Sequence, residues 1–212
     1  ALLEKARLLD RTGHREEADA IFAGFPVREA PEGMSAPDLT ALAAGCQEQA
    51  LRTHDKDLLK KVMAELYTRA QQADPGYRPA RYEAGLLFAL KHQYSHAASE
   101  FEAVLKQDDT DAFAWYGMAL TAWGQGNYGK AQEAARKALE ADANQEETQL
   151  LLASMAVWDE EDAEADRLAR AVLKRNASSL EAEALLAALA FLKGDEAGGR
   201  RRRQTLEDLC PD

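Results

Sequence analysis

Small residues recur in this chain at an interval of 34 positions. Ala97, Ala131 and Ala165 lie 34 residues apart, and Gly199 is the next residue on the same grid. An interval of this length predicts a stacked repeat in which each unit is a helix, a turn and a second helix. The chain is therefore expected to be all-α, because each unit can bury its apolar face only against its neighbours.

Other positions follow the same interval when repeats begin at residues 78, 112, 146 and 180. The seventh residue of each repeat is apolar and the eighth is small: Ala84, Met118, Leu152 and Leu186, then Gly85, Ala119, Ala153 and Ala187. Gly126 and Gly194 stand where a first helix ends and provide its left-handed turn residue. The pattern predicts helix pairs at about 79–92 with 95–107, 112–125 with 128–141, 146–158 with 162–175, and 180–193 with a last helix ending near Leu209.

The residues of the second repeat identify a family that the chain resembles. Trp115, Tyr116, Met118, Ala119, Gly126, Tyr128, Ala131, Ala138 and Leu139 match the tetratricopeptide repeat pattern. The resemblance implies a right-handed α-solenoid of antiparallel helix pairs. It divides the chain into four regular repeats at 78–111, 112–145, 146–179 and 180–212, all in one continuous solenoid.

The first third of the chain, residues 1–77, fits the repeat pattern only with irregular helix pairs. Its prolines and glycines predict a loop near residues 24–37, and the proline signal with the apolar spacing predicts a helix from about Pro37 to Thr53. Gly13, Ala18, Phe22 and Phe25 lie on family spacing with only part of a helix before them. We therefore expect the chain to begin inside a repeat.

The chain is acidic, with 37 Asp and Glu against 26 Lys and Arg and a formal net charge of -11. This charge disfavours free nucleic acid and anionic membranes as partners. Arg200 to Arg203 form the one basic run, but four consecutive helical residues point in all directions, so a solvated end helix is favoured over an acidic partner or an RNA contact. No apolar run is long enough to span a membrane.

The two cysteines, Cys46 and Cys210, would lie far apart in a rod-like array, which predicts free thiols. Free thiols favour a reducing compartment, so the cytoplasm is favoured and the periplasm stays open.

The search for catalytic motifs gives no candidate. His92 and His96 have the spacing of a metal pair, but the repeat grid places one at a turn and the other in the next helix, which predicts surface histidines. Nucleotide-binding glycine loops and the hydrolase serine motif are missing from the sequence. The acidic run from Asp159 to Asp166 is interpreted as a solvated turn. We therefore expect no metal, no cofactor and no enzyme activity.

The resemblance implies a concave groove lined by the first helix of each repeat. Its groove positions carry ten apolar side chains: Tyr82, Leu86, Phe113, Tyr116, Leu120, Trp123, Leu150, Val157, Trp158 and Phe191. Exposed apolar area marks binding sites, and aromatic residues are their usual anchors. Core packing of individual side chains, Trp123 among them, stays an alternative, as does filling of the groove by a C-terminal helix or another copy. Trp115, by contrast, is expected to face the repeat core.

These residues predict a protein-interaction scaffold that binds an apolar or amphipathic partner segment. The family members that clamp chaperone C-termini do so with polar and basic groove residues, whereas Leu86 and Gly117 stand at the matching positions here. Two alternatives remain open. The segment Leu180 to Asp195 also resembles repeat arrays that precede a metallopeptidase-like domain, which would make the chain a non-catalytic part of a larger enzyme. The other alternative is a self-association module acting through the groove or the array ends.

Overall fold

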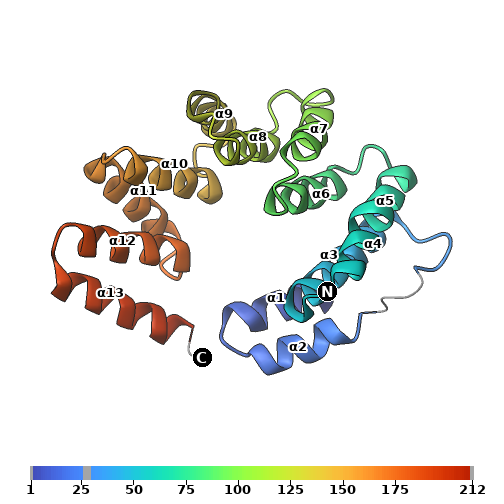
Figure 1. Cartoon of the computed structure of the whole chain (residues 1–212), viewed down its shortest axis with the longest axis horizontal. Helices are drawn as coiled ribbons and strands as arrows, with labels where there is room; N and C mark the ends of the chain where they lie inside the picture. The colour runs from blue at the N-terminus through green and yellow to red at the C-terminus, as the bar shows by residue number, and fades with distance from the viewer. Residues whose placement is uncertain (1, 26–29, 211–212) are drawn as a thin grey trace.

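The protein is built from helices arranged in consecutive antiparallel pairs (Figure 1). The computed structural model describes residues 2–25 and 30–210, and no strand occurs among them. In the regular part, the observed helix ends lie within two residues of the expected ones: α6 (Arg78–Leu90), α7 (Tyr94–Leu105), α8 (Ala112–Gly124), α9 (Tyr128–Ala141), α10 (Glu146–Trp158), α11 (Asp162–Arg175), α12 (Leu180–Leu192) and α13 (Glu196–Leu209).

The N-terminal third follows the same plan less regularly, as expected. Its first pair is α1 (Leu2–Arg11) with α2 (Arg15–Ala23). The predicted helix near Pro37 is α3 (Ala36–Thr53), whose 18 residues make it longer than any helix of the regular part. Its partner is one continuous helical run with a π-helical segment in the middle: α4 (Lys56–Lys61), η1 (Val62–Leu66) and α5 (Tyr67–Ala73). The expected loop lies between α2 and α3, and its residues 26–29 fall outside the described residues.

Two positions after each first helix of the regular repeats lies a residue with left-handed backbone conformation. These residues are 34 positions apart, at His92 (φ 57°), Gly126 (φ 73°), Glu160 (φ 59°) and Gly194 (φ 76°). The two glycines confirm the sequence prediction. The histidine and the glutamate were not predicted there, because a side chain disfavours this conformation.

The core between helices is made mainly of alanine. The recurring alanines Ala97, Ala131 and Ala165 are all fully buried, so the 34-residue grid marks positions in the core between helices. The ring of Phe101 on α7 is also fully buried, and it packs on the backbone of Gly85 in α6 and Gly117 in α8. A Cβ atom at either glycine would overlap this ring, so the two glycines form the socket for Phe101.

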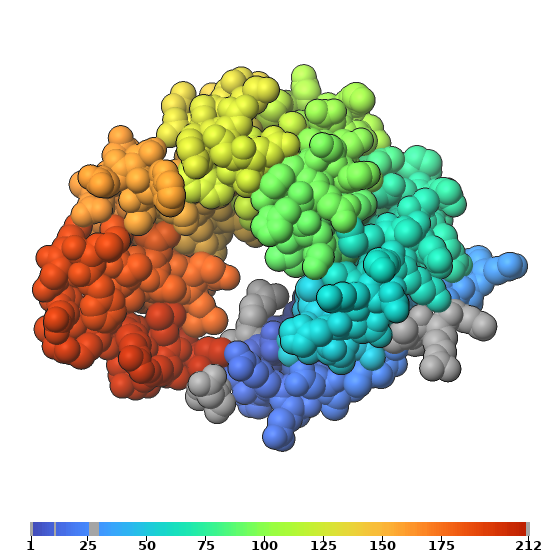
Figure 2. Space-filling view, in the orientation of Figure 1, coloured from blue at the N-terminus to red at the C-terminus, as the bar shows by residue number. Residues whose placement is uncertain are grey.

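The array curves strongly. In the space-filling view it forms an almost closed ring around an opening, and α13 comes round toward the α1 and α2 pair (Figure 2). The expectation of a rod-like array was therefore wrong, because each repeat turns relative to the last and the turns accumulate in one direction. Cys46 and Cys210 are nevertheless free, as predicted. Within the described residues, no helix has the length and apolar character needed to cross a bilayer.

Candidate functional site

The inner face of the curved array is formed by the first helices of the repeats. α6 contacts α8, α8 contacts α10 and α10 contacts α12, whereas the second helices α7, α9, α11 and α13 make no such contacts with one another in the described part of the chain. A stack whose first helices touch while its second helices separate must curve with the first helices inside. The concave face is therefore the one on which the ten groove residues were expected.

Three aromatic rings on α6 and α8 lie in succession on this face. The ring centroids of Tyr82 and Phe113 are 4.7 Å apart, and those of Phe113 and Tyr116 are 5.6 Å apart in an edge-to-face arrangement. All three side chains are partly buried and partly exposed. We call Tyr82, Phe113 and Tyr116 the inner triad. Rings in such contact stabilise one another, so the triad is a preformed apolar surface.

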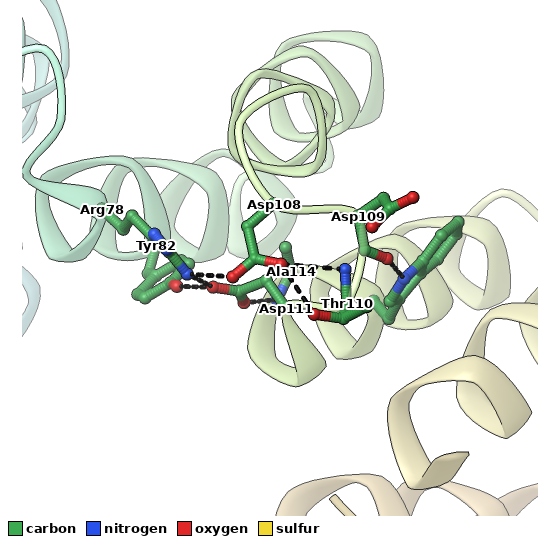
Figure 3. A network of polar contacts seen from close by, with 8 residues as sticks. Arg78, Tyr82, Asp108, Asp109, Thr110, Asp111 and Ala114 are labelled. Atoms are coloured by element: carbon green, nitrogen blue, oxygen red, sulfur yellow. Dashed lines mark hydrogen bonds and ion pairs between the residues drawn. The ribbon is translucent and has the colours of Figure 1, made fainter. Parts of the chain in front are cut away.

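The loop between α7 and α8 fixes the Tyr82 ring (Figure 3). The Tyr82 hydroxyl donates a hydrogen bond to Asp111, whose other carboxylate oxygen accepts from the Ala114 amide at 2.8 Å and so caps α8. Arg78 also reaches Asp111 at 2.7 Å and Asp108 at 2.8 Å. Burial, with the nearby Asp111 carboxylate, raises the pKa of Tyr82. Tyr82 therefore presents its ring rather than its hydroxyl to a partner.

Carboxylates lie beside the inner triad. Burial raises the pKa of Tyr116 to about 12, and the negative charges of Glu147 and Glu181 add to this effect. These two glutamates begin α10 and α12, the first helices of the next two repeats, and both are exposed. The inner face thus combines an aromatic surface with negative charge, although the groove prediction named apolar residues alone.

The remaining predicted residues do not continue the triad as a single line. Leu86, Leu120 and Val157 are partly buried and pack against the repeat core, and Leu150 is partly buried as well. Phe191 is 45% exposed and lies against Gly199 of α13. Trp123 and Trp158 contact one another at the C-terminal end of α8, away from the triad, with their ring centroids 6.3 Å apart.

Tyr128, which was not among the predicted site residues, completes this second cluster. Its ring centroid lies 4.9 Å from that of Trp123 and 6.4 Å from that of Trp158. Tyr128 begins a second helix, so the groove positions expected from the family could not include it. Arg78 and Asp111 were also missed, because their role depends on a loop that brings residues 78, 82 and 111 together in space.

Trp115 was expected to face the repeat core. Its ring packs against the buried core cluster around Ala131 and Met155, as expected, although the side chain is only partly buried. Its indole nitrogen donates to the Asp109 carbonyl oxygen at 2.7 Å, and the Lys137 ammonium lies 4.3 Å from its ring. The indole N–H of a tryptophan needs a hydrogen-bond acceptor, and here the acceptor is a backbone carbonyl at the surface. Only part of the ring therefore packs on the core.

The histidines lie where the sequence placed them. His92 occupies the turn after α6 and bonds to the Tyr94 hydroxyl at 2.7 Å, while His96 is in α7 and stacks on Phe88 at 5.2 Å. Across residues 2–25 and 30–210, no three His, Cys, Asp or Glu side chains come together as a metal site would require.

The arginine run points in several directions. Arg202 pairs with Glu183 of α12 at 2.7 Å, while Arg200 and Arg203 pair within α13, with Glu196 at 3.0 Å and Glu207 at 2.9 Å. This geometry gives no single basic face.

Comparison with known proteins agrees with this architecture. Residues 114–145 match the family model for the tetratricopeptide repeat. Solved structures of similar fold cover 80% to 99% of the chain. PilF of Pseudomonas aeruginosa has a TM-score of 0.61 at 18% identity, covering 99% of this chain and 90% of its own. A thermophilic tetratricopeptide repeat protein of Thermus thermophilus has a TM-score of 0.65 at 12% identity, covering 80% and 92%.

The chain therefore contains a tetratricopeptide repeat at residues 114–145, and its fold is that of solved tetratricopeptide repeat proteins. A third similar structure is YrrB, described as a tetratricopeptide repeat protein with an unusual peptide-binding site, with a TM-score of 0.51 at 19% identity over 80% of this chain and 87% of that one. A search of curated proteins found no match. This fold supports a protein-interaction scaffold in general.

Proposed function

We propose that this tetratricopeptide array is a non-catalytic scaffold that binds an extended or helical segment of a partner protein along its inner face. The observation that carries the proposal is the inner triad, three contacting and partly exposed rings held on the concave side of α6 and α8. Partly exposed aromatic rings on a rigid scaffold are the usual anchors of protein interfaces. YrrB, which shares the fold, is described as having a peptide-binding site.

The proposed partner segment is amphipathic. Its apolar side chains pack on the rings of Tyr82, Phe113 and Tyr116. Glu147 and Glu181 stand beside Tyr116 and favour lysine or arginine on the adjoining face of the segment. The net charge of -11 acts in the same direction, because it attracts a basic segment and repels an acidic one.

A selection from a random peptide library against the immobilised full chain tests this proposal, followed by titration of the selected peptides in solution. We expect peptides that combine apolar and basic residues. Phe113→Ala should weaken their binding by about 2 kcal/mol or more, the size of an interface hot spot. Because the Phe113 ring is partly exposed, the same change should reduce the free energy of unfolding by less than about 2 kcal/mol.

Phe101→Ala is the matched control, since Phe101 is fully buried beneath the same helices. It should lower the free energy of unfolding by about 3 to 5 kcal/mol and affect binding only through folding. Selected peptides that bind Phe113→Ala and Tyr116→Ala as tightly as the unmodified chain would rule out the inner triad as the binding surface.

A further inference from the structure

A second aromatic surface lies at the other end of the same helices. It consists of Trp123 at the end of α8, Tyr128 at the start of α9 and Trp158 at the end of α10, and we call it the aromatic corner. Its ring centroids are 4.9, 6.3 and 6.4 Å apart. Phe113 and Trp123 are ten residues apart on one helix, so about 15 Å of helix separates the corner from the inner triad.

The aromatic corner is more exposed than core packing requires. Trp158 is 66% exposed and Tyr128 is 45% exposed, while the buried core beneath them is made by small or flexible side chains such as Ala131, Ala135 and Met155. Tryptophan is among the most buried residue types on average. A contiguous exposed pair of large rings therefore marks an interaction surface.

Negative charge borders the exposed rings. Trp158 is followed at once by Asp159, Glu160, Glu161 and Asp162. Asp162 is paired with Lys193 at 3.8 Å, and Asp159 accepts a long hydrogen bond of 3.5 Å from Gln132. Glu160 and Glu161 are exposed, and neither has an ion-pair partner within the described residues.

Two aromatic rings elsewhere in the protein contact a cationic side chain of the same chain. The Lys137 ammonium lies 4.3 Å from the Trp115 ring and is paired with Glu133 at 3.2 Å. The Arg52 guanidinium lies 4.7 Å from the Phe22 ring. These are the cation and ring pairs of residues 2–25 and 30–210, and neither reaches the aromatic corner. Trp158 thus has the ring and the neighbouring carboxylates of a cation site without an internal cation.

We propose that the aromatic corner binds an arginine or lysine side chain of a partner protein. The cation lies over the faces of Trp158 and Tyr128, where the ring quadrupole attracts it, and Glu160 and Glu161 supply the opposite charge. Trp123 supports both rings from beneath. The site is separate from the inner triad, so a partner that uses both would span the length of the first helices.

The probe is a pentapeptide with the sequence Gly-Arg-Gly-Arg-Gly, capped at both ends and titrated into the full chain. The control peptide carries citrulline in place of each arginine, which keeps the shape and removes the charge. The indole N–H resonances of the three tryptophans report where the peptide binds. We expect Trp158 and Trp123 to shift saturably with a Kd of roughly 1 mM, Trp115 to stay unchanged, and the citrulline peptide to bind at least about tenfold more weakly.

Substitutions separate the corner from the inner face. Trp158→Ala should weaken arginine-peptide binding about tenfold, and Trp158→Phe should restore part of it. Glu160→Gln with Glu161→Gln should weaken binding about threefold and reduce its salt dependence. Glu102→Gln, which removes an exposed negative charge of α7 outside both the corner and the inner face, is the matched control and should leave this binding unchanged. Trp158 is largely exposed, so these variants should fold.

Three results would overturn the proposal. The first is equal binding of the arginine and citrulline peptides, and the second is unchanged binding by Trp158→Ala. The third is a concentration-dependent dimer, seen by sedimentation, that Trp158→Ala dissociates, because a second copy would then cover the corner. None of these results bears on the inner triad, since Phe113→Ala and its selected peptides test that face independently.

Discussion

At the scale of single residues, the regular repeats differ in the residue that adopts the left-handed conformation after the first helix. A residue with positive φ follows each first helix, and only two of these four residues are glycine: His92, Gly126, Glu160 and Gly194. A residue with a Cβ pays about 1 to 2 kcal/mol for this conformation. The backbone geometry of the turn is therefore kept in every regular repeat, although the residue best suited to it is present in only half of them.

Glu160→Gly should accordingly raise the free energy of unfolding by about 1 kcal/mol, because it removes the Cβ at φ 59°. Urea unfolding measures the change. Glu160→Ala is the control, since it removes the same charge and keeps the Cβ, and it should give no comparable gain. An alanine variant as stable as the glycine variant would show that charge rather than backbone conformation governs this position.

Glu48 predicts how stability depends on pH. Burial raises its pKa above 4.5, and Arg7 and Arg52 oppose that shift. The folded protein therefore binds a proton at Glu48 more readily than the unfolded chain does. The free energy of unfolding should therefore increase as the pH falls through this raised pKa toward 4.5, and it should decrease as the pH rises again. Glu48→Gln should remove this component from a series of urea melts.

Asp108 provides the comparison of opposite sign. Hydrogen bonds from Thr110, together with Arg78, lower its pKa below 3.8. Its stabilising contribution is present above pH 3.8 and is lost as the pH falls through the lowered pKa. Asp108→Asn should therefore change the melts only in the acid range. Identical pH profiles for Glu48→Gln and the unmodified chain would show that Glu48 titrates normally.

At the scale of helices, packing depends on where small residues face large ones. Phe101 of α7 is buried against Gly85 and Gly117, whereas Gly129 at the start of α9 has open space at its Cβ position. The two kinds of helical glycine should therefore respond in opposite ways to the same substitution.

Gly117→Ala should lower the free energy of unfolding by about 1 to 3 kcal/mol, because the added methyl group overlaps the Phe101 ring. Gly129→Ala should raise it by up to about 1 kcal/mol, because alanine is the better helix former and nothing lies within 4 Å. Thermal or urea melts of the two variants test the socket directly. Stabilisation by Gly117→Ala would mean that Phe101 has room to move.

The last helix, α13, carries two adjacent glycines, each costing roughly 1 kcal/mol relative to alanine. Hydrogen exchange should therefore be faster in α13 than in any other helix of the regular repeats. A Cβ at Gly198 would overlap the carboxylate of Asp195, which caps α13. The equivalent cap of α8, Asp111, accepts a hydrogen bond from the Ala114 amide although Ala114 has a Cβ. Gly198→Ala should therefore stabilise the helix once the Asp195 side chain moves aside. Gly199→Ala should not, because Phe191 occupies that space. Exchange in α13 as slow as in α9 would contradict this expectation.

At the scale of the whole molecule, curvature and charge act together. Arg7 of α1 pairs with Glu83 of α6 at 3.3 Å, so the first helices of repeats that are not adjacent meet on the inside of the curve. The inner face therefore carries an ion pair at its N-terminal end. Farther along it carries the inner triad with Glu147 and Glu181, which have no ion-pair partner within the described residues. A partner segment that follows the curve would meet these two environments in succession.

The sequence alone was sufficient for the helix pairs, their turns and the repeat interval. These features depend on local preferences: alanines where helices touch, glycines at two of the left-handed turns and acidic or amide caps at helix starts. Each preference acts over a few residues, and the 34-residue repetition made the weak signals agree. Residues that break the preference, such as His92 and Glu160, gave no signal of the left-handed conformation that they adopt.

Only the tertiary structure decided how the predicted groove residues are grouped. Tyr82, Phe113 and Tyr116 form one surface, while Trp123 and Trp158 form another with Tyr128. The position of a residue in the sequence determines on which face of its helix the Cβ atom lies. The direction of its ring depends on partners from other repeats, such as Asp111 for Tyr82, and on a superhelical turn that accumulates along the array and that no single repeat encodes.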